Sequence, residues 1–465
     1  MQTATATRPG VGNRYSFAIL NGSRQEVGGI LRLAAPVAAL ALVNMAMSVT
    51  DTLMAASLGA ESLAATAVGS DFYSLVFYLS VGILGGLAPL YAAAHASEDA
   101  DLLRRLRGSG WFIAVVIGGP AITAVWFSPD YLYRIGIAPA LLERGDGYIR
   151  AMGLTLAPMI AAMVLRTRLT ASERAGSLLW ITATAVPMNA ALNYVLMFGV
   201  AGWPGLGITG AGVSSFVVAS FTAAGFAWLA ARNGDRGMAT RIDWVQVREI
   251  LRVGLPIGVA TVSEVGLFLG ATLYVATISV PDAAAHALAI RTAGVVYAIS
   301  IGLQQAALVR LARAAADIGR HRAIMAGALA LAVVAGVVIF SAVLTLAGSL
   351  PTVLQAGTSG ADAARIAAQL LVLLALSELV TPLGAASAGL LRGLRITRPA
   401  MIFSLAGNWL IAAPIAIWLS SVHGMGAQGV WIGLAFGPSV AGILTAASLR
   451  RHWTNVDRAP AAASR

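Results

Sequence analysis

Acidic residues inside long apolar runs are the part of this sequence most able to do chemistry. Glu264 lies within GLPIGVATVSEVGLFLGATLYVATIS, residues 254–279. About ten residues into a helix that rises ~1.5 Å per residue, its carboxyl group would be roughly 15 Å deep, near the bilayer midplane. A charge at that depth costs about 2.5–3.5 kcal/mol on insertion scales. A residue retained at such a cost predicts a function, and the alternative is a structural acid bonded to a hydroxyl group.

Asp51 shows the same pattern at the end of NMAMSVTD, residues 44–51. Burial disfavours the charged form of a carboxyl group, which suits a group that binds and releases a proton or a small cation. Asn189 and Asn193 are one helical turn apart, so both amides would lie on one helix face, where they could coordinate a cation or bond to Asp51. The alternatives are a helix-capping role for Asp51 and interhelical hydrogen bonding for the two amides.

Glu378 also lies in the middle of an apolar run, LLALSELVTP, residues 373–382. If it faces the same cavity as Glu264, the two carboxyl groups could share a proton or hold a sodium ion. The alternative is again a structural role.

These residues must be positioned by membrane-spanning helices. The chain has 465 residues, of which 58% are hydrophobic and 11% are charged, whereas soluble domains carry about 25% charged residues. The absence of cysteine excludes disulfides and thiolate chemistry, and the five histidines have no metal-ligand spacing. We therefore expect an all-α integral membrane protein that is not an enzyme, with no metal site and no cofactor beyond a coupling ion, H⁺ or Na⁺.

The arginines predict the topology. All 31 basic residues are arginine. Arg134, Arg144, Arg150 and Arg365 fall on one side of the predicted spans, Arg291 falls inside a span, and the others fall on the second side, which the positive-inside rule makes cytoplasmic. We expect a multi-pass protein of a bacterial inner membrane, with both termini cytoplasmic and no signal peptide. The twelve predicted spans are 29–57, 62–94, 109–128, 147–170, 177–199, 206–231, 249–279, 283–310, 323–347, 363–391, 399–420 and 426–449.

The two halves of the chain look like copies. A constant shift of 220 residues places Leu31-Arg32 on Leu251-Arg252, Pro36 on Pro256, and residues 80–82 on residues 300–302. Six helices per copy predict a parallel repeat, in which two pseudo-symmetric bundles are related by an axis along the membrane normal. Chance similarity between Ala- and Gly-rich helices is the alternative. The predicted organisation is an N-terminal segment (1–27), an N-lobe (28–232), a linker (233–248), a C-lobe (249–450) and a cytoplasmic tail (451–465).

The repeat suggests moving parts as well. Pro36 and Pro256 would each remove a backbone donor and favour a bend, so they are candidate hinges, unless they mark a static kink or a helix start. The same shift relates Asp71 to Arg291, which places them at equivalent depth. They could form an interlobe ion pair in one access state only, or each could be satisfied within its own lobe.

The order and spacing of several stretches resemble the multidrug and toxic compound extrusion (MATE) family, from about residue 28 to residue 450. The stretches are VTDTLM (49–54), LGAESLAA (58–65), LPIG (255–258) followed by Glu264, and AGLLRG (388–393). The resemblance implies two six-helix lobes that form a V around a central cleft. It also implies efflux of cationic, amphipathic compounds by sodium or proton antiport.

The resemblance assigns roles to individual residues. Asp51 matches the family's helix-1 acid, and its usual partners on helices 5 and 6 correspond to Asn189, Asn193 and Ser215. Glu264 matches the helix-7 acid of one branch of the family.

That branch pairs the helix-7 acid with an Asp in helix 10. The corresponding position here is Thr381, and Glu378, one turn earlier on the same face, is the candidate substitute. Substrate selection would come from side chains lining the cleft, for which lipid-facing or packing roles are the alternatives. The named candidates are Asn44, Met45, Met47 and Tyr73.

The sequence therefore predicts a secondary antiporter that exports small cationic molecules by alternating access. We expect a monomer in contact with membrane lipid, without a nucleic-acid partner. A related flippase for lipid-linked or polysaccharide precursors is the nearest alternative, but the mainly acidic core disfavours anionic cargo. An intramembrane transferase would need a clustered catalytic constellation, which the sequence does not show. A channel is disfavoured by the buried acids that the repeat does not reproduce.

Overall fold

The computed structural model describes residues 11–134, 139–173, 175–200, 202–232, 242–314, 317–354 and 361–462. Within these ranges all regular structure is helical. Eleven helices are long and apolar enough to cross a membrane, and a twelfth span is a bent pair. The all-helical fold class with twelve spans is therefore confirmed.

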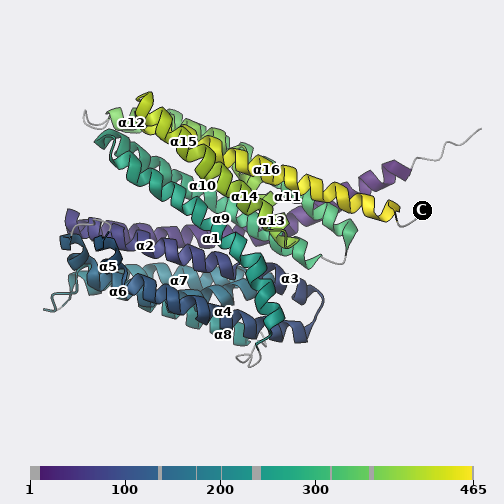
Figure 1. Cartoon of the computed structure of the whole chain (residues 1–465), viewed down its shortest axis with the longest axis horizontal. Coiled ribbons are helices and arrows are strands. Elements are labelled where there is room, and N and C mark those ends of the chain that lie inside the picture. The colour runs from purple at the N-terminus through teal and green to yellow at the C-terminus, as the bar shows by residue number, and fades with distance from the viewer. Residues whose placement is uncertain are drawn as a thin grey trace, which may run out of the picture.

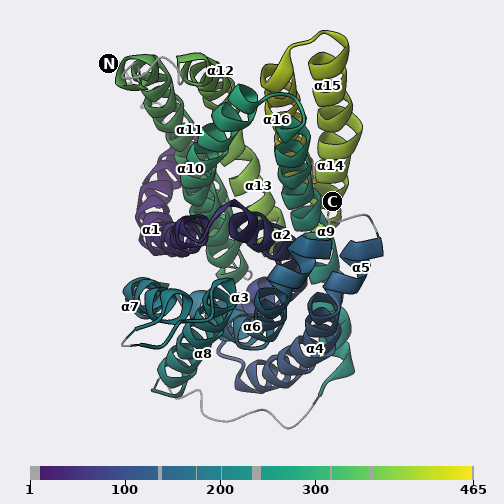
Figure 2. The same cartoon turned by 90° about the vertical axis from the view of Figure 1, so that its left-hand side faces the viewer.

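The chain forms two groups of helices, which Figures 1 and 2 show as a purple-to-teal bundle (α1 to α8) beside a teal-to-yellow one (α9 to α16). The first bundle consists of α1 (Val11–Ser57), α2 (Ala60–Leu84), α3 (Leu87–Ala96), α4 (Ala100–Trp126), α5 (Ser128–Arg134), α6 (Pro139–Ala171), α7 (Ala175–Asn193), the π-helical turn η1 (Tyr194–Phe198) and α8 (Ile208–Arg232). The second consists of α9 (Trp244–Ala276), α10 (Val280–Arg313), α11 (Ile318–Leu354), α12 (Ala361–Glu378), α13 (Thr381–Gly393), α14 (Arg398–Leu405), the π-helical η2 (Ala406–Ala412), α15 (Ala413–Ile417), η3 (Trp418–Val422) and α16 (Gly426–Ala462).

The helix contacts repeat between the bundles. Inside the first bundle α6 packs against α8 and α2, and inside the second α12 and α13 pack against α16 and α10. Between the bundles α1 packs against α10, and its counterpart contact joins α2 to α9. The predicted pseudo-symmetry of the two six-helix bundles is thus present in the packing.

Glycines allow the bundles to approach closely. A Cβ added to Gly82 of α2 would come within 2.4 Å of the Gly258 Cα in α9. At the equivalent place, a Cβ on Gly302 of α10 would come within 2.6 Å of the Ala34 carbonyl oxygen in α1. Gly82 and Gly302 belong to the repeated segments at residues 80–82 and 300–302, so the repeat preserves the small residues that close helix contact requires.

The bent span breaks between α12 and α13, which meet at an angle of 40°. Pro382 occupies the first turn of α13 and cannot donate a backbone hydrogen bond into α12. The break directly follows Glu378, the last residue of α12. The predicted acid is therefore next to freed backbone groups rather than inside a regular helix.

Several predicted boundaries differ from the structure. Helix α1 begins at Val11, so much of the predicted N-terminal segment is helical, while residues 1–10 lie outside the described ranges. Residues 233–241 of the predicted linker also lie outside them, and α9 already begins at Trp244, capped by the Asp243 carboxylate at 2.9 Å from the Val245 nitrogen. Helix α16 extends to Ala462 through the predicted tail. Hydropathy marks where a segment leaves the membrane, whereas helical hydrogen bonding continues past that point.

The helices also place both candidate hinges. Pro36 lies well inside α1 and Pro256 well inside α9. Reading either proline as a helix start is therefore wrong, because the polar segments before them continue the helix. Both remain candidate hinges.

Ion pairs join the bundles at the end where α1 and α11 begin and α10 ends. Glu26 of α1 accepts hydrogen bonds from Arg310 and, at 2.7 Å, from Arg320. Glu173, in the turn after α6, accepts from Arg310 at 3.1 Å and is 3.6 Å from Arg313. We call these five residues the Glu26 cluster.

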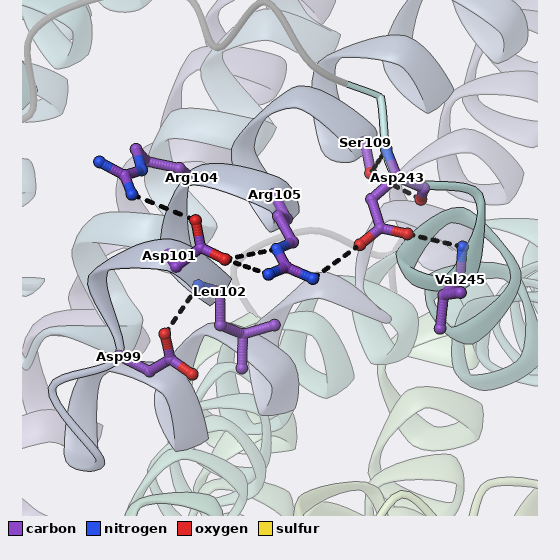
Figure 3. Close-up of polar contacts among 8 residues, drawn as sticks. All are labelled: Asp99, Asp101, Leu102, Arg104, Arg105, Ser109, Asp243 and Val245. Atoms are coloured by element: carbon purple, nitrogen blue, oxygen red, sulfur yellow. Dashed lines mark hydrogen bonds and ion pairs between the residues drawn. The ribbon is translucent and has the colours of Figure 1, made fainter.

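A second junction joins α4 to the start of α9 at the same end of the molecule. Arg105 of α4 lies 3.7 Å from the Asp243 carboxylate. The Ser109 hydroxyl group donates to the Asp243 carbonyl oxygen at 3.0 Å (Figure 3). With the Glu26 cluster, this junction holds together the ends predicted to be cytoplasmic.

Candidate cation-binding sites

The first candidate site is the carboxyl group of Asp51 in α1. The Asn193 side-chain amide, from the last residue of α7, donates to Asp51 Oδ1 at 2.5 Å. Asn189 lies one turn earlier, with its Oδ1 3.5 Å from the Asn193 amide nitrogen. Asn189 and Asn193 are almost completely buried. The three residues that the sequence suggested as partners therefore do come together.

This cluster contains an oxygen that has no partner. Asn193 Oδ1 is buried and makes no hydrogen bond in the described part of the chain. An amide oxygen and a carboxylate are the kind of oxygen ligands that small hard cations take. An added proton on Asp51 would also supply a donor for such an acceptor.

A serine next to the predicted helix-6 partner contacts this cluster, while Ser215 itself remains a prediction. Ser214, not Ser215, is fully buried, and its hydroxyl group is 3.4 Å from the backbone carbonyl oxygen of Asn189. Adjacent helical residues point about 100° apart, so a shift of one position changes the face. A π-helical turn, η1, directly follows Asn193, and such turns are frequent at functional sites.

The second candidate site lies in the other bundle. The Tyr297 hydroxyl group of α10 donates to Glu264 Oε1 in α9 at 2.8 Å. Arg392 of α13 is near enough to act electrostatically on both side chains, and it donates to Gln304 at 2.8 Å. Glu264 is thus held by the Tyr297 hydroxyl group of the neighbouring helix α10.

Glu378 ends α12, which packs against α10, the helix that carries Tyr297. Its side chain is 4% exposed, and its Oε2 atom has no hydrogen-bond partner among the described residues. Thr381, at the position where the resemblance expects Asp, donates its hydroxyl hydrogen to the Ser377 carbonyl oxygen at 3.0 Å. A buried carboxyl oxygen without a partner suits a group that takes up a proton or cation.

A hydrogen-bonded group beside Glu264 was not predicted. Ser263 accepts from the Asn408 amide at 3.2 Å and from the Trp409 indole at 3.1 Å. Asn408 lies next to the position that the repeat assigns to Asn189 in the second copy. Extending the internal repeat to Asn189 would have pointed to it.

His286 is a second residue that the sequence analysis missed. The Trp431 indole donates to His286 Nδ1 at 3.0 Å, so the proton of a neutral ring lies on Nε2, which is 2.9 Å from the Thr272 hydroxyl oxygen. The ring is 2% exposed and joins α9, α10 and α16. As an isolated histidine in the sequence, it gave no signal of these partners.

The remaining predicted residues are more dispersed. No ion pair joins Asp71 to Arg291, although the structure describes both, so that pair remains a prediction for another access state. Tyr73 is buried and stacks on Phe77 with ring centroids 5.7 Å apart, which makes it a core residue in this conformation.

The other three cleft candidates lie along α1. Asn44 is exposed, and Met45 and Met47 are half-buried. The Met45 methyl group would be 3.1 Å from a Cβ added to Gly294 of α10, so this side chain lies at the boundary between the bundles. In the part of the chain that the structure describes, no three His, Asp or Glu side chains gather as a metal site.

Relatives with known names match most of the chain. The "Probable multidrug resistance protein NorM" of Bradyrhizobium diazoefficiens is 34% identical over 89% of this chain and 91% of its own length. The "Multidrug resistance protein NorM" of Burkholderia vietnamiensis is 31% identical over 89% of this chain and 92% of its own length.

Solved structures share the fold. The eukaryotic MATE transporter AtDTX14 superposes with a TM-score of 0.81 at 20% identity, covering 91% of this chain and 95% of that one. An outward-facing multidrug resistance MATE family transporter gives a TM-score of 0.80 at 16% identity, covering 92% of this chain and 96% of that one.

The family profile described as MatE matches residues 36–195 and 256–418, once in each bundle. The two matched segments contain Asp51, Asn189, Asn193, Glu264 and Glu378. The chain therefore belongs to the MatE family, the MATE transporters that its sequence resembles.

Proposed function

We propose that this protein is a multidrug efflux transporter that exports cationic, amphipathic compounds in exchange for H⁺ or Na⁺. The observation that carries the proposal is the Asp51 cluster, in which a carboxyl group inside a membrane-spanning helix is bonded to Asn193 beside an unpaired amide oxygen. The relatives named as multidrug resistance proteins support the substrate class.

The proposed cycle depends on competition for the same negative charges. A cationic drug enters from the cytoplasm and is attracted by carboxylates in the two bundles. A proton or sodium ion arriving from outside neutralises Asp51 or the Glu264 region, which removes that attraction and releases the drug. Inward movement of one cation across about 100 mV supplies ~2.3 kcal/mol.

The coupling ion can move the bundles only through its differential affinity for the two access states. Asn189 and Asn193 belong to α7, whereas Asp51 belongs to α1, which packs against α10 of the other bundle. A cation bound between α1 and α7 would therefore act on a helix at the bundle interface. We propose that a cation bound at Glu264 also acts on an interface helix, because α9 packs against α2 of the first bundle.

We further propose that the protein acts as a monomer in a bacterial inner membrane, with its arginine-rich side and both termini in the cytoplasm. The charge asymmetry of the loops supports this orientation.

The test is dye efflux from proteoliposomes under an imposed proton gradient and, separately, a sodium gradient. Asp51→Asn and Glu264→Gln should each lower the efflux rate at least about tenfold, and the effective gradient identifies the ion. Asp146→Asn is the matched control, because Asp146 forms an exposed ion pair with Arg150 at 2.9 Å. Normal efflux by both site variants would refute the site assignment.

A further inference from the structure

A cavity of about 1020 Å³ lies between the two bundles at the end predicted to be cytoplasmic. From the first bundle it is lined by Leu90 of α3 and by Leu102 and Leu106 of α4, of which Leu90 and Leu106 are buried and Leu102 is half-buried. The second contributes the start of α9 and the segment between α13 and α14. In Figure 1 this end of α9 reaches the first bundle near α3 and α4.

The cavity is the pseudo-symmetric counterpart of the Glu26 cluster. The repeat shift that relates Pro36 to Pro256 also relates Glu26 to Gln246, and it relates Leu90 to Arg310. Both Gln246 and Leu90 line the cavity. The turns after α6 and α13 also correspond, because they follow the fourth span of each bundle, and Glu173 and Arg395 in these turns both have φ of 61°. The second copy thus has glutamine and arginine where the first has its two acids.

This exchange leaves positive charge in the cavity. Arg248, Arg252, Arg395 and Arg398 line it together with a single acid, Glu249. Glu249 lies 3.6 Å from Arg252 and 3.9 Å from Arg395. Neither Arg248 nor Arg398 makes an ion pair within the described ranges. The site therefore has one acid for four arginines, whereas the Glu26 cluster has two acids for three arginines.

The rim of the cavity has the character of a membrane interface. Trp244 and Val245 line it and are 68% and 72% exposed. The Trp244 ring meets Phe112 edge-on, with centroids 5.4 Å apart. Tryptophan and arginine at a helix end are typical of the level of lipid headgroups. Basic pockets between helices on the cytoplasmic side suit anionic headgroups.

We propose that the cavity binds an anionic phospholipid from the cytoplasmic leaflet. The phosphate group contacts Arg248 and Arg398, and an acyl chain lies along the half-buried Leu102 of α4 and the exposed Trp244 ring. The lipid thereby supplies the negative charge that Glu26 and Glu173 supply at the counterpart site. Because its head contacts one bundle and its chain the other, it stabilises the conformation in which these ends are packed together.

Native mass spectrometry of the purified full chain, titrated with phosphatidylglycerol or phosphatidylcholine, tests the proposal without a transport measurement, so its outcome is independent of the proposed function. Wild type should retain phosphatidylglycerol preferentially. The double variant Arg248→Gln/Arg398→Gln should bind it roughly 30-fold more weakly, which is about 2 kcal/mol at ~1.4 kcal/mol per tenfold change. Both side chains are exposed, so folding should be preserved, as gel filtration checks.

Two further variants sharpen the test. Arg32→Gln/Arg450→Gln removes the same charge from exposed arginines outside the cavity and should leave binding unchanged. Gln246→Glu recreates the missing acid and should weaken phosphatidylglycerol binding without affecting phosphatidylcholine.

Three results would overturn the proposal. One is equal retention of the two lipids by wild type, and another is unchanged binding by the Arg248→Gln/Arg398→Gln variant. The third is full displacement of phosphatidylglycerol by equimolar glycerol 3-phosphate, which would identify a site for soluble phosphates instead.

Discussion

Neutralising Glu26 should open the cytoplasmic end of the bundle interface. Glu26 accepts hydrogen bonds from Arg310 and Arg320, and the Arg310 guanidinium also lies against α1, where a Cβ on Gly29 would be 2.7 Å from its Cζ atom. Glu26→Gln keeps the shape of the side chain but leaves Arg310 with Glu173 as its remaining acid. Only the conformation with packed bundles contains these contacts, so their loss favours the open one.

The magnitude follows from burial. The Glu26 and Arg310 side chains are 10% and 13% exposed, whereas Arg320 is 43% exposed. Breaking a fully buried pair costs about 3–5 kcal/mol, and exposed pairs contribute about 0–1 kcal/mol. Because Arg310 retains Glu173 and Arg320 is partly solvated, we expect about 1.5–3 kcal/mol, which raises the open population roughly 10- to 100-fold.

Cysteine labelling can measure this change, because the native chain contains no cysteine. Ala171 is fully buried at the junction, and its carbonyl oxygen accepts from Arg313 at 3.1 Å. In everted vesicles, Ala171→Cys should react with an impermeant maleimide roughly 10- to 100-fold faster when combined with Glu26→Gln. Glu61→Gln is the control, because its pair with Arg144 is at a distant, exposed position. Equal labelling rates in the Glu26 and Glu61 variants would refute the reasoning.

Three further substitutions have defined outcomes. Gly254→Ala should lower the melting temperature or stop transport, because the added Cβ would be 1.9 Å from the Ile83 carbonyl oxygen. Gly270→Ala is the control and should do neither, because nothing lies close to a Cβ at that position. Trp431→Phe should destabilise the fold by about 1–3 kcal/mol in thermal unfolding, because it leaves the buried Nδ1 atom of His286 without its hydrogen-bond donor. An unchanged melting temperature would contradict this. Tyr297→Phe should lower efflux severalfold at unchanged stability, because it removes the hydrogen bond to the Glu264 carboxyl group. Efflux at the wild-type rate would count against a role for that bond.

The sequence was sufficient for features that depend on composition and periodicity. Long apolar runs predicted the spans, and the constant shift between the two copies predicted the pseudo-symmetry of the bundles. Asp51, Asn189 and Asn193 were expected together from helix spacing and from the family resemblance. The structure brings them within hydrogen-bonding distance, while their role in transport remains a prediction.

Other features depend on helix rotation and on tertiary contacts, which spacing alone does not determine. Ser214, next to the predicted Ser215, contacts Asn189 because the rotation of α8 about its axis decides which serine faces α7. Tyr297 and His286 acquire their partners from helices far along the chain. The helical extensions of α1 and α16 were missed because polar composition ends a membrane span but does not end a helix.

The charge difference between the copies was also hidden in the sequence. In the sequence, Gln246 and Arg395 give no sign of a special role. The packing shows that they occupy the places in the second bundle that Glu26 and Glu173 occupy in the first. The comparison needs both the repeat and the three-dimensional contacts. It also explains how two similar bundles can have different partners at equivalent positions.

The central claim is that a small cation and the exported drug compete for Asp51 and for the Glu264 region. The most direct measurement is equilibrium binding of a fluorescent cationic dye to purified protein while the proton or sodium concentration is raised. We predict that the coupling ion displaces the dye from wild type and that Asp51→Asn abolishes or strongly weakens this displacement. Identical displacement curves for wild type and Asp51→Asn, with either ion, would contradict the claim.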